Sequence, residues 1–404
     1  MRQGVSEFQG ARLTQAREGR GMTQTMLATL IGRSSTAISR WEKGDQFPEQ
    51  EALESLSNKL TMPISWFLKP LPEYGNQPYF FRSRAATTRW ARAIAKTRLE
   101  LTHETGLALQ EYVDLPSVNV PSLGSTDYLK IRDDDIERLA TELRKHWNMG
   151  LGPISDLSLA LENAGIVISR EPLESPSMDG VSKWFDADQR PCIFLNNDKH
   201  NYFRQRFDLA HELGHLILHR HLTEIEFNSR YTEIEHQANV FASAFLLPAE
   251  TFSMEIGAPS LSNYLALKSR WKTSSAAMIS RSKHLGIISE EYATRLWKNY
   301  SARGWRKGEP GDDQTELEQL RLLSRAVRLL IDEGGFAVGQ LISEIGLFEA
   351  DLETLADLPQ GFLSRRDAKV LSLKLKSNNA ENIKTRTTEK MATVVSLHGH
   401  RKSV

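Results

Sequence analysis

The chain has 404 residues, with 51 Lys and Arg against 51 Asp and Glu, and 40% of its residues are hydrophobic. This length and apolar content suit roughly two or three folded domains, and the zero net charge excludes an overall basic field that would draw the chain to nucleic acid. The single cysteine, Cys192, excludes a disulfide framework, and the lack of an apolar run of about 18 residues excludes a membrane span, so we expect a cytoplasmic protein without a membrane partner.

The first predicted elements are short helices. Thr23 can cap a helix that Gly32 ends, and the next helix covers residues 35–44. Ile38 and Trp41, three residues apart, point inward from this helix. Polar residues suited to base edges and phosphates in the major groove remain outside, and these candidate DNA-binding residues are Gln24, Ser34, Ser35, Thr36, Ser39, Arg40 and Lys43.

The pattern runs from Thr-Gln at residues 23–24 to Ile-Ser-Arg-Trp-Glu-Lys-Gly-Asp at residues 38–45, and it resembles the Cro and phage-repressor (XRE) class. The resemblance implies a five-helix domain over residues 1–71 that binds a double-stranded DNA operator. Such domains usually act as dimers on two-fold sites, so a homodimer is an open expectation. A helical adaptor that never touches DNA is the alternative interpretation.

Residues 72–130 are predicted to connect this domain to the next one. A hinge rich in Pro and Gly covers residues 72–78, residues 79–113 look largely helical, and residues 114–126 look extended. Basic residues without an acid among them gather next to aromatic ones on the predicted helix: Phe80, Phe81, Arg82, Arg84, Arg89, Trp90, Arg92, Lys96 and Arg98. Phosphate contact and a solvated helix face explain this cluster equally well.

A second folded domain is predicted over residues 131–305. Its first elements are helices over residues 134–146 and 157–163, followed by short strands over residues 166–170, 181–185 and 192–195. An edge strand of so small a sheet can hold an extended peptide by backbone pairing.

The most specific chemical signal is His-Glu-Leu-Gly-His at residues 211–215, on a predicted helix. Two histidines four residues apart lie on one face and can bind one zinc ion, while Glu212 lies beside that ion, where it can take a proton from bound water. Gly214 costs the helix about 1 kcal/mol relative to Ala, which predicts a close approach to its backbone. A core helix with two surface histidines is the alternative.

A zinc site of this kind needs a third protein ligand. The best donor lies on a second predicted helix, residues 232–248, where Glu235 and Asn239 share one face with small alanines that permit close helix packing. Glu235 is the expected ligand, and Asn239 is expected to support the site from behind. Glu233 and His236 are rival ligands.

Together the motifs His-Glu-Leu-Gly-His and Glu-x-x-Ala-Asn-x-Phe-Ala-x-x-x-Leu-x-Pro resemble the ImmA/IrrE family of bacterial and phage zinc peptidases, over roughly residues 131–305. The resemblance implies a minimal zincin in which His211, His215 and Glu235 bind Zn²⁺ and Glu212 is the general base. It therefore implies a gluzincin-like metallo-endopeptidase, and an activity that is weak or conditional fits this interpretation.

Two details stay open at this level. The family often has a Glu where this chain has Gln237. A hydrogen-bond donor is also needed for the oxyanion of the tetrahedral intermediate, and the candidates are Tyr231, His236, His200 and His219.

The remainder of the chain carries no chemistry that the sequence identifies. Residues 312–380 are predicted to be a helical C-terminal region, and residues 381–404 form a basic tail for which disorder is the default expectation. The expected fold class is therefore mainly α with a small β-sheet (α+β).

The combination predicts a DNA-binding transcriptional regulator whose zinc domain cleaves a repressor or another partner protein in a stress, phage or mobile-element response. Its own linker, near residues 72–78 or 116–121, is a further candidate substrate. The alternative is the antitoxin and repressor of a toxin–antitoxin module, whose zinc domain is mainly a scaffold that binds the toxin. The intact Glu212 argues against a pure scaffold, which has no need of a general base.

Overall fold

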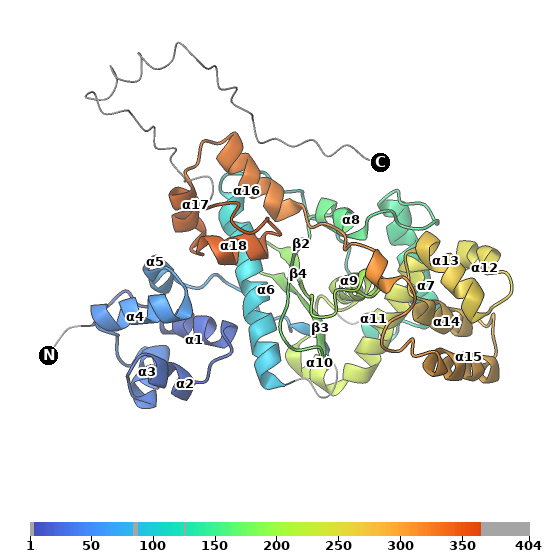
Figure 1. Ribbon diagram of the computed structural model, residues 1–404, viewed down its shortest axis with the longest axis horizontal. Helices are drawn as coiled ribbons and strands as arrows, with labels where there is room; N and C mark the ends of the chain where they lie inside the picture. The colour runs from blue at the N-terminus through green and yellow to red at the C-terminus, as the bar shows by residue number, and fades with distance from the viewer. Residues whose placement is uncertain (1–3, 84–87, 125–126, 365–404) are drawn as a thin grey trace, which may run out of the picture. The chain divides into compact units, whose positions relative to one another are not determined.

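The computed structural model describes residues 4–83, 88–124 and 127–364 (Figure 1). The predicted basic tail, residues 381–404, lies outside the described residues. The described part is mainly helical with one small mixed sheet, which confirms the predicted fold class. None of the described helices combines the length and the apolar character that a membrane crossing requires.

Five short helices open the chain, as predicted: α1 (Gly10–Gly19), α2 (Gln24–Leu30), α3 (Ser35–Lys43), α4 (Gln50–Leu60) and α5 (Ile64–Leu68). Their ends follow the predicted caps. Thr23 Oγ1 accepts a hydrogen bond from the Met26 amide at 3.1 Å, and Ser34 Oγ accepts one from the Ala37 amide at 3.1 Å. Gly44 then ends α3 in the left-handed region, with φ of 75°.

The sheet has four strands in the order β1-β3-β4-β2: β1 (Phe80–Ser83), β3 (Met178–Phe185), β4 (Arg190–Asn196) and β2 (Val167–Glu171). β2 runs parallel to β4, and the other neighbours are antiparallel. Side chains alternate between two hydrophobic cores. Val181 and Phe194 face the long helix α6 (Arg89–Gln110), whereas Ile193 and Leu195 face helix α9 (Tyr202–Leu218).

The connector after the first five helices contains a strand where we predicted a helix. The predicted helix start at residue 79 is wrong, because Phe80–Ser83 forms β1 and α6 begins only at Arg89. Aromatic residues favour a strand when a partner strand is present, and the partner β3 lies about a hundred residues further along the chain. A local pattern cannot show such a pairing.

Most of the remaining helices gather around α9 on the side of the sheet away from α6 (Figure 1). They are α7 (Asp133–His146), α8 (Leu157–Asn163), α10 (Glu224–Ser229), α11 (Tyr231–Leu246), α12 (Ala249–Glu255), α13 (Leu261–Trp271), α14 (Ser275–His284) and α15 (Glu290–Ala302). The predicted helices over residues 134–146 and 157–163 and the three predicted strands agree with α7, α8, β2, β3 and β4 within a few residues.

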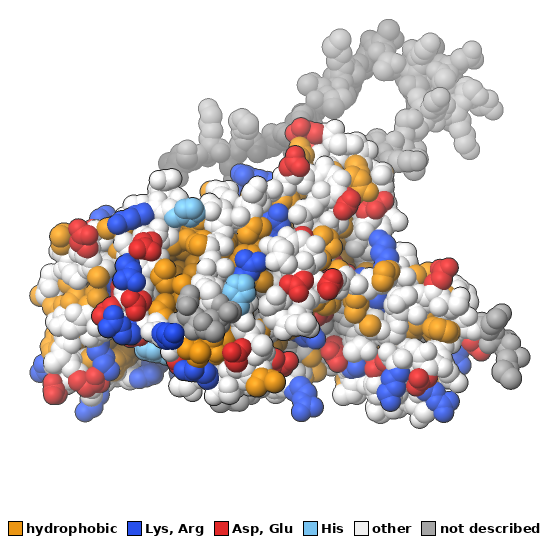
Figure 2. Space-filling view, turned by 180° about the vertical axis from the view of Figure 1, so that it is seen from behind, with side chains coloured by type: hydrophobic (Ala, Val, Ile, Leu, Met, Phe, Trp, Pro, Cys, Tyr) orange, Lys and Arg blue, Asp and Glu red, His pale blue; other side chains and the backbone are white. Residues whose placement is uncertain are grey.

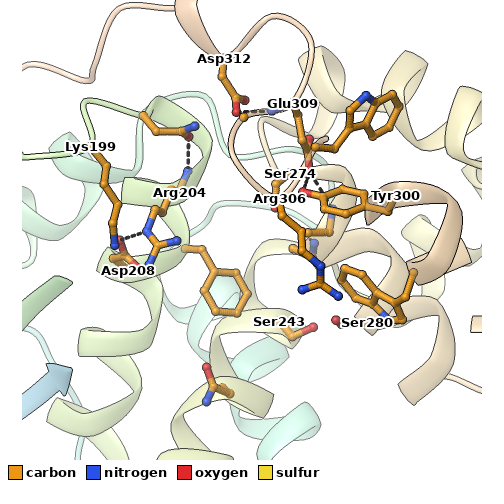
Figure 3. A pocket seen from close by; sticks show the side chains of 18 of the residues that line it. Lys199, Arg204, Asp208, Ser243, Ser274, Ser280, Tyr300, Arg306, Glu309 and Asp312 are labelled. Carbon is orange, nitrogen blue, oxygen red and sulfur yellow. Dashed lines mark hydrogen bonds and ion pairs between the residues drawn. The ribbon is translucent and has the colours of Figure 1, made fainter. Parts of the chain in front are cut away.

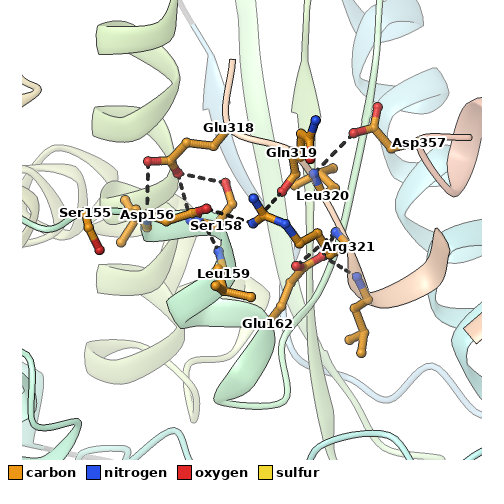
Figure 4. Close-up of polar contacts among 12 residues, drawn as sticks. Ser155, Asp156, Ser158, Leu159, Glu162, Glu318, Gln319, Leu320, Arg321 and Asp357 are labelled. Atoms are coloured by element: carbon orange, nitrogen blue, oxygen red, sulfur yellow. Dashed lines mark hydrogen bonds and ion pairs between the residues drawn. The ribbon is translucent and has the colours of Figure 1, made fainter. Parts of the chain in front are cut away.

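The C-terminal region begins as an extended strap, residues 316–321, and continues as α16 (Leu322–Asp332), α17 (Val338–Ile345) and α18 (Glu349–Leu355). The strap is held by carboxylates that accept backbone hydrogen bonds (Figure 4). Glu318 accepts from the amides of Leu157 and Ser158 at 3.1 and 2.8 Å. Glu162 accepts in turn from the amides that open α16. The helices of this region then join the hydrophobic core that also contains the first five helices and α6.

Candidate metal centre and DNA-binding face

His211 and His215 lie one turn apart on α9 and are both fully buried. Their Nε2 atoms are 3.0 Å apart. Glu235 on α11 places Oε1 3.2 Å from His215 Nε2 and Oε2 3.6 Å from His211 Nε2. The structure thus brings the three predicted ligands together, with one donor atom of each lying within 4.8 Å of the others.

This meeting depends on Gly214, which lies between the ligand-bearing turns of α9. A Cβ at this position would lie 3.2 Å from the carbonyl oxygen and 3.3 Å from the Cα of Ala238 on α11. The predicted close approach is confirmed, and its partner is the helix that carries Glu235.

The side chain of Asn239 fixes the proton on His211. Its amide nitrogen donates to the Glu235 carbonyl oxygen at 2.8 Å, which leaves Oδ1 as the acceptor facing the histidine. His211 Nδ1 lies 3.1 Å from that oxygen and must therefore carry its proton. The Nε2 lone pair of His211 is left to face His215 and Glu235, as expected of a metal ligand supported from behind.

A longer chain of contacts fixes the proton on His215. Gln237 donates from Nε2 to the Tyr128 carbonyl oxygen at 2.9 Å, so its Oε1 accepts from His219 Nε2 at 2.8 Å. His219 Nδ1 is then an acceptor, and His215 Nδ1 donates to it over 3.0 Å. The Nε2 atom of His215 therefore also presents a lone pair.

Two imidazole lone pairs facing each other beside a carboxylate repel one another unless a cation lies among them. Burial, together with the Arg82 guanidinium, holds the pKa of His211 well below its usual range, so a proton is a poor candidate for that cation. In a tetrahedral zinc site with bonds of about 2.0–2.1 Å, ligand atoms lie about 3.3 Å apart. The observed donor set fits such a divalent ion.

Glu212 lies against strand β3 and is fully buried. Its Oε2 accepts a hydrogen bond from Ser182 Oγ at 2.6 Å. Its Oε1 receives no hydrogen bond within the described part of the chain and lies beside Gly180, whose missing side chain leaves room for it. Burial raises the pKa of Glu212 well above its usual range, and the Ser182 hydroxyl acts against that rise. One carboxylate oxygen is thus anchored and the other can exchange a proton.

Strand β1 adds two side chains that our sequence interpretation did not assign to the site. The Phe80 ring stacks on the His215 ring, with centroids 4.9 Å apart and planes 7° apart. Arg82 pairs with the buried Asp208 on α9, with Nε 2.7 Å from Oδ1. The aromatic and basic residues were visible in the sequence, but only the pairing of β1 with β3 brings Phe80 and Arg82 to the candidate ligands.

Tyr231 is the first residue of α11 and lies one turn before Glu235, half-exposed at the rim of the site. Burial raises the pKa of its hydroxyl, and the negative charges of Glu235 and Glu212 contribute to the rise. Its hydroxyl therefore lies within the electrostatic reach of both carboxylates.

The other candidates do not converge on the ligands. His236 turns to Asp133 on α7, with 3.0 Å between Nε2 and Oδ1, and Glu233 pairs with Arg230. His236 follows Glu235 by one residue and Glu233 precedes it by two, and a helix turns by about 100° per residue, so both side chains point in other directions than that of Glu235. His200 is exposed in the turn between β4 and α9, and both ring nitrogens of the buried His219 are engaged in the chain of contacts from His215 to Gln237.

A cavity of about 740 Å³ adjoins the site on the side of Arg82 and Asn239. Figure 3 shows Lys199, Arg204 and Asp208 on one wall and, facing them, residues that follow α14, with Ser243 and Ser280 between the two walls. Aromatic rings contribute to the lining, among them Phe207, Trp297, Tyr300 and Trp305. The cavity therefore combines apolar surface with both signs of charge.

On the DNA-binding side, the predicted pattern is present. Ile38 and Trp41 are buried, whereas the predicted contact residues Ser34, Ser35, Thr36, Arg40 and Lys43 are exposed and Ser39 is half-buried. Gln24 donates to Glu42 Oε2 at 2.6 Å, and Glu42 also pairs with Arg17. The amide of Gln24 is thus partly used to hold α2 against α3.

The basic cluster of the connector is mostly engaged within the chain. Arg98 lies 3.3 Å from Glu171 and 3.5 Å from Asp351, Lys96 lies 3.8 Å from Glu100, and Arg84 is outside the described residues. These pairs weaken the phosphate-contact interpretation. Figure 2 agrees with the zero net charge, since basic and acidic side chains are interspersed over the face that it shows.

Comparison with known proteins identifies two regions. Residues 161–283 match the sequence profile of the IrrE N-terminal-like domain, and residues 10–63 match that of a helix-turn-helix domain. The HTH-type transcriptional activator BcrR of Enterococcus faecalis is 39% identical over 57 residues, which span 14% of this chain and 28% of that protein. The chain therefore combines a helix-turn-helix domain with an IrrE N-terminal-like domain, in agreement with both resemblances.

Proposed function

We propose that this protein is a DNA-binding transcriptional regulator that carries a zinc-dependent endopeptidase. Residues 1–71 are the proposed DNA-binding domain and residues 131–305 the proposed peptidase domain. One observation carries the enzymatic half: the Nε2 atoms of His211 and His215 lie 3.0 Å apart and 3.6 and 3.2 Å from the Glu235 carboxylate, while their Nδ1 atoms face hydrogen-bond partners elsewhere.

Bound zinc would polarise the peptide carbonyl and make its water acidic enough to lose a proton near neutral pH. Glu212 is placed to receive that proton on Oε1 and to pass it to the leaving amine, because Ser182 already occupies Oε2. Tyr231 is the preferred donor to the oxyanion, since its hydroxyl lies at the rim beside Glu235. The substrate we favour is a repressor or partner protein, in line with the presence of a DNA-binding domain in the same chain.

The experiment uses the purified full chain, elemental analysis of bound metal, and cleavage of proteins encoded beside its gene. The Glu212→Gln variant is expected to keep one zinc per chain and to lose cleavage by at least about 100-fold. Glu233→Gln is the matched control, because this half-exposed carboxylate pairs with Arg230 and should change neither property. Wild-type protein without stoichiometric metal, or undiminished cleavage by Glu212→Gln, would contradict the assignment.

The DNA-binding half is tested separately with genomic fragments selected by the full chain. Arg40→Ala is expected to weaken binding of the selected fragment by roughly 10-fold or more, since the exposed Arg40 lies on the outer face of α3. Glu54→Ala, on the exposed face of α4, serves as a control. Equal binding by all three proteins would exclude α3 as the recognition helix.

One observation favours the antitoxin alternative. His211, Glu212 and His215 are fully buried, and such an enclosed site suits a scaffold better than an enzyme that is open to its substrate. A toxin-like neighbour that forms a stable complex with Glu212→Gln and wild-type chains alike, without cleavage by either, would favour this second function.

A further inference from the structure

We infer that β1 occupies the place of the substrate on strand β3, and that the substrate is an extended segment with an aromatic side chain where Phe80 lies and a basic one where Arg82 lies. This inference rests on the proposed function of the site. It names the class of substrate and explains why the ligands are enclosed.

β1 joins the sheet from outside the matched region. The region that matches the IrrE N-terminal-like domain, residues 161–283, already contains β2, β3 and β4. β1 comes from the connector between the two matched regions and pairs with the outer edge of β3. Without it, β3 would present a row of unpaired amides and carbonyls, which is the template to which an extended peptide adds.

The register places this edge at the proposed general base. Phe80 lies opposite Ser182, and Arg82 lies opposite Gly180. Directly opposed residues share one face of a sheet, and on this face Ser182 and Gly180 flank the Glu212 carboxylate. A peptide that replaced β1 in the same register would therefore pass beside Glu212.

The two side chains of β1 that face the site fill two different subsites. Phe80 is fully buried, stacked on His215 and edge-on to Phe227, whose ring centroid is 5.3 Å away. Arg82 meets the buried carboxylate of Asp208 and packs over the Phe207 ring at 5.2 Å. The first subsite selects an aromatic group and the second selects a cation.

The same arrangement closes the site. The histidines and Glu212 have no exposed surface, and the side chain of Glu235 is only 17% exposed. The second subsite continues into the cavity of about 740 Å³, because Arg82 itself lines that cavity. An incoming strand has space beyond this subsite, but it has to displace β1 to reach the ligands.

β1 is short enough to be displaced. It contributes four residues, and its register with β3 shifts between Arg82 and Ser83. The preceding segment is held by Lys183, whose ammonium donates to the carbonyl oxygens of Gln77 and Gly75, and by Gln77, which donates to Asp186 at 2.9 Å. These are polar contacts that water can replace.

The test measures binding of a probe that copies β1. The probe is a fluorescein-labelled peptide Gln-Pro-Tyr-Phe-Phe-Arg-Ser, the sequence of residues 77–83, and the readout is fluorescence anisotropy. The protein is the zinc-loaded full chain with Glu212→Gln, so that the probe is not cut. Adding Phe80→Ala and Arg82→Ser should increase the affinity for the probe by at least about 10-fold, because the competing strand is weakened.

Two controls accompany this comparison. Phe81→Leu alters the opposite face of β1 and should leave the affinity at the level of Glu212→Gln alone. A probe with Ser in place of its Arg, the counterpart of Arg82, tests the cationic subsite, and a probe with Ser at the counterpart of Phe80 tests the aromatic one. The probe lacking the Phe80 counterpart and the probe lacking the Arg82 counterpart should each bind at least about 10-fold more weakly.

The outcomes separate this inference from the proposed function. Equal probe affinity with intact and weakened β1, or no binding by a weakened variant that is folded and holds zinc, would overturn the inference. If Phe80→Ala prevents folding, Arg82→Ser alone decides, because it removes the ion pair with Asp208 and the contact with the Phe207 ring but leaves the buried Phe80 in place. Probe binding without any cleavage when Glu212 is restored would support the substrate site and contradict the peptidase.

Discussion

The proton on each buried histidine is positioned by an amide side chain from α11. Asn239 leaves its carbonyl oxygen to His211, and Gln237 acts on His215 through His219. A carboxylate at position 237 would accept from His219 equally well, but it would also face the Tyr128 carbonyl oxygen without a proton to donate. Gln237 thus fixes the same tautomer of His219 as a glutamate would, without adding a negative charge to the chain of contacts.

Gln237→Leu tests this role at nearly constant side-chain volume. Without the amide, His219 loses the partner that orients it, and His215 loses a fixed acceptor. We expect the affinity for zinc to fall by about 10- to 100-fold, as measured by competition with a chromogenic chelator. His236→Ala is the control, because His236 pairs with Asp133 away from the ligands. Unchanged zinc affinity in Gln237→Leu would show that the chain of contacts does not support the metal.

At this scale the sequence predicts the grouping of the candidate ligands better than the residues that support them. His211 and His215 were predictable because a spacing of four residues places both on one helix face whatever surrounds them. The prediction of Glu235 required only one further assumption, that the next predicted helix packs against the helix with the two histidines. The role of His219 depends on Gln237 and on a carbonyl of residue 128, which come from three separate segments, so the sequence left His219 as one oxyanion candidate among several.

Among the elements, the contact between α9 and α11 determines whether the candidate ligands meet, and a Cβ at position 214 would lie only 3.2–3.3 Å from atoms of α11. Gly214→Ala is expected to lower the free energy of unfolding by about 1–3 kcal/mol, because the added methyl meets the backbone of Ala238 and the buried Phe241 ring rather than a flexible side chain. Gly339→Ala in α17 is a matched control: its new Cβ meets nothing within 4 Å, and the change should stabilise by up to about 1 kcal/mol. Urea unfolding of both variants measures the contrast, and equal effects would contradict it.

A second element-scale contact depends on pH. Glu162 accepts hydrogen bonds from the first amides of α16, yet burial raises its pKa from 4.5 to about 7. The folded state therefore binds this proton more tightly than the unfolded state does. The resulting stabilisation is complete below pH 4.5 and is lost as the pH rises through about 7.

Because of this group, the free energy of unfolding is expected to fall by about 2 kcal/mol between pH 5 and pH 8. Glu162→Gln removes the titration, so its free energy of unfolding should decline less over that interval than that of the wild type. Urea unfolding of both proteins at the two pH values gives the difference. Parallel declines in the two proteins would mean that Glu162 does not titrate in this range.

Elements with strong local signals were predictable, and those defined by distant partners were not. The caps at Thr23 and Ser34 act within one turn, so the helices of the DNA-binding region appear where the sequence places them. The sequence predicted helix at β1 because this segment is a strand only through its pairing with the edge of β3, which a local pattern does not reveal. The strap before α16 is likewise extended because distant carboxylates, those of Glu162 and Asp357, accept hydrogen bonds from its amides.

In the whole molecule, the sheet separates two cores, and the first five helices share one of them with α6 and the C-terminal helices. The C-terminal region, to which the sequence assigned no role, therefore contacts the DNA-binding region directly. Arg20, which caps the C-terminal end of α1, binds Asp351 on α18 through both carboxylate oxygens, at 3.1 and 2.6 Å. Arg98 on α6 approaches the same carboxylate at 3.5 Å. Three segments thus meet at one acidic side chain.

Asp351→Ala would leave two partly buried guanidinium groups without this partner, at a cost of about 1–3 kcal/mol. Because the pair joins α1 to α18, we expect amide hydrogen exchange to accelerate in both helices, although more than 300 residues separate them in sequence. Asp351→Asn keeps an acceptor for one guanidinium and should show a smaller effect, and Glu333→Ala, at an exposed site after α16, should show none. Faster exchange confined to α18 would mean that the DNA-binding helices are held by apolar packing alone.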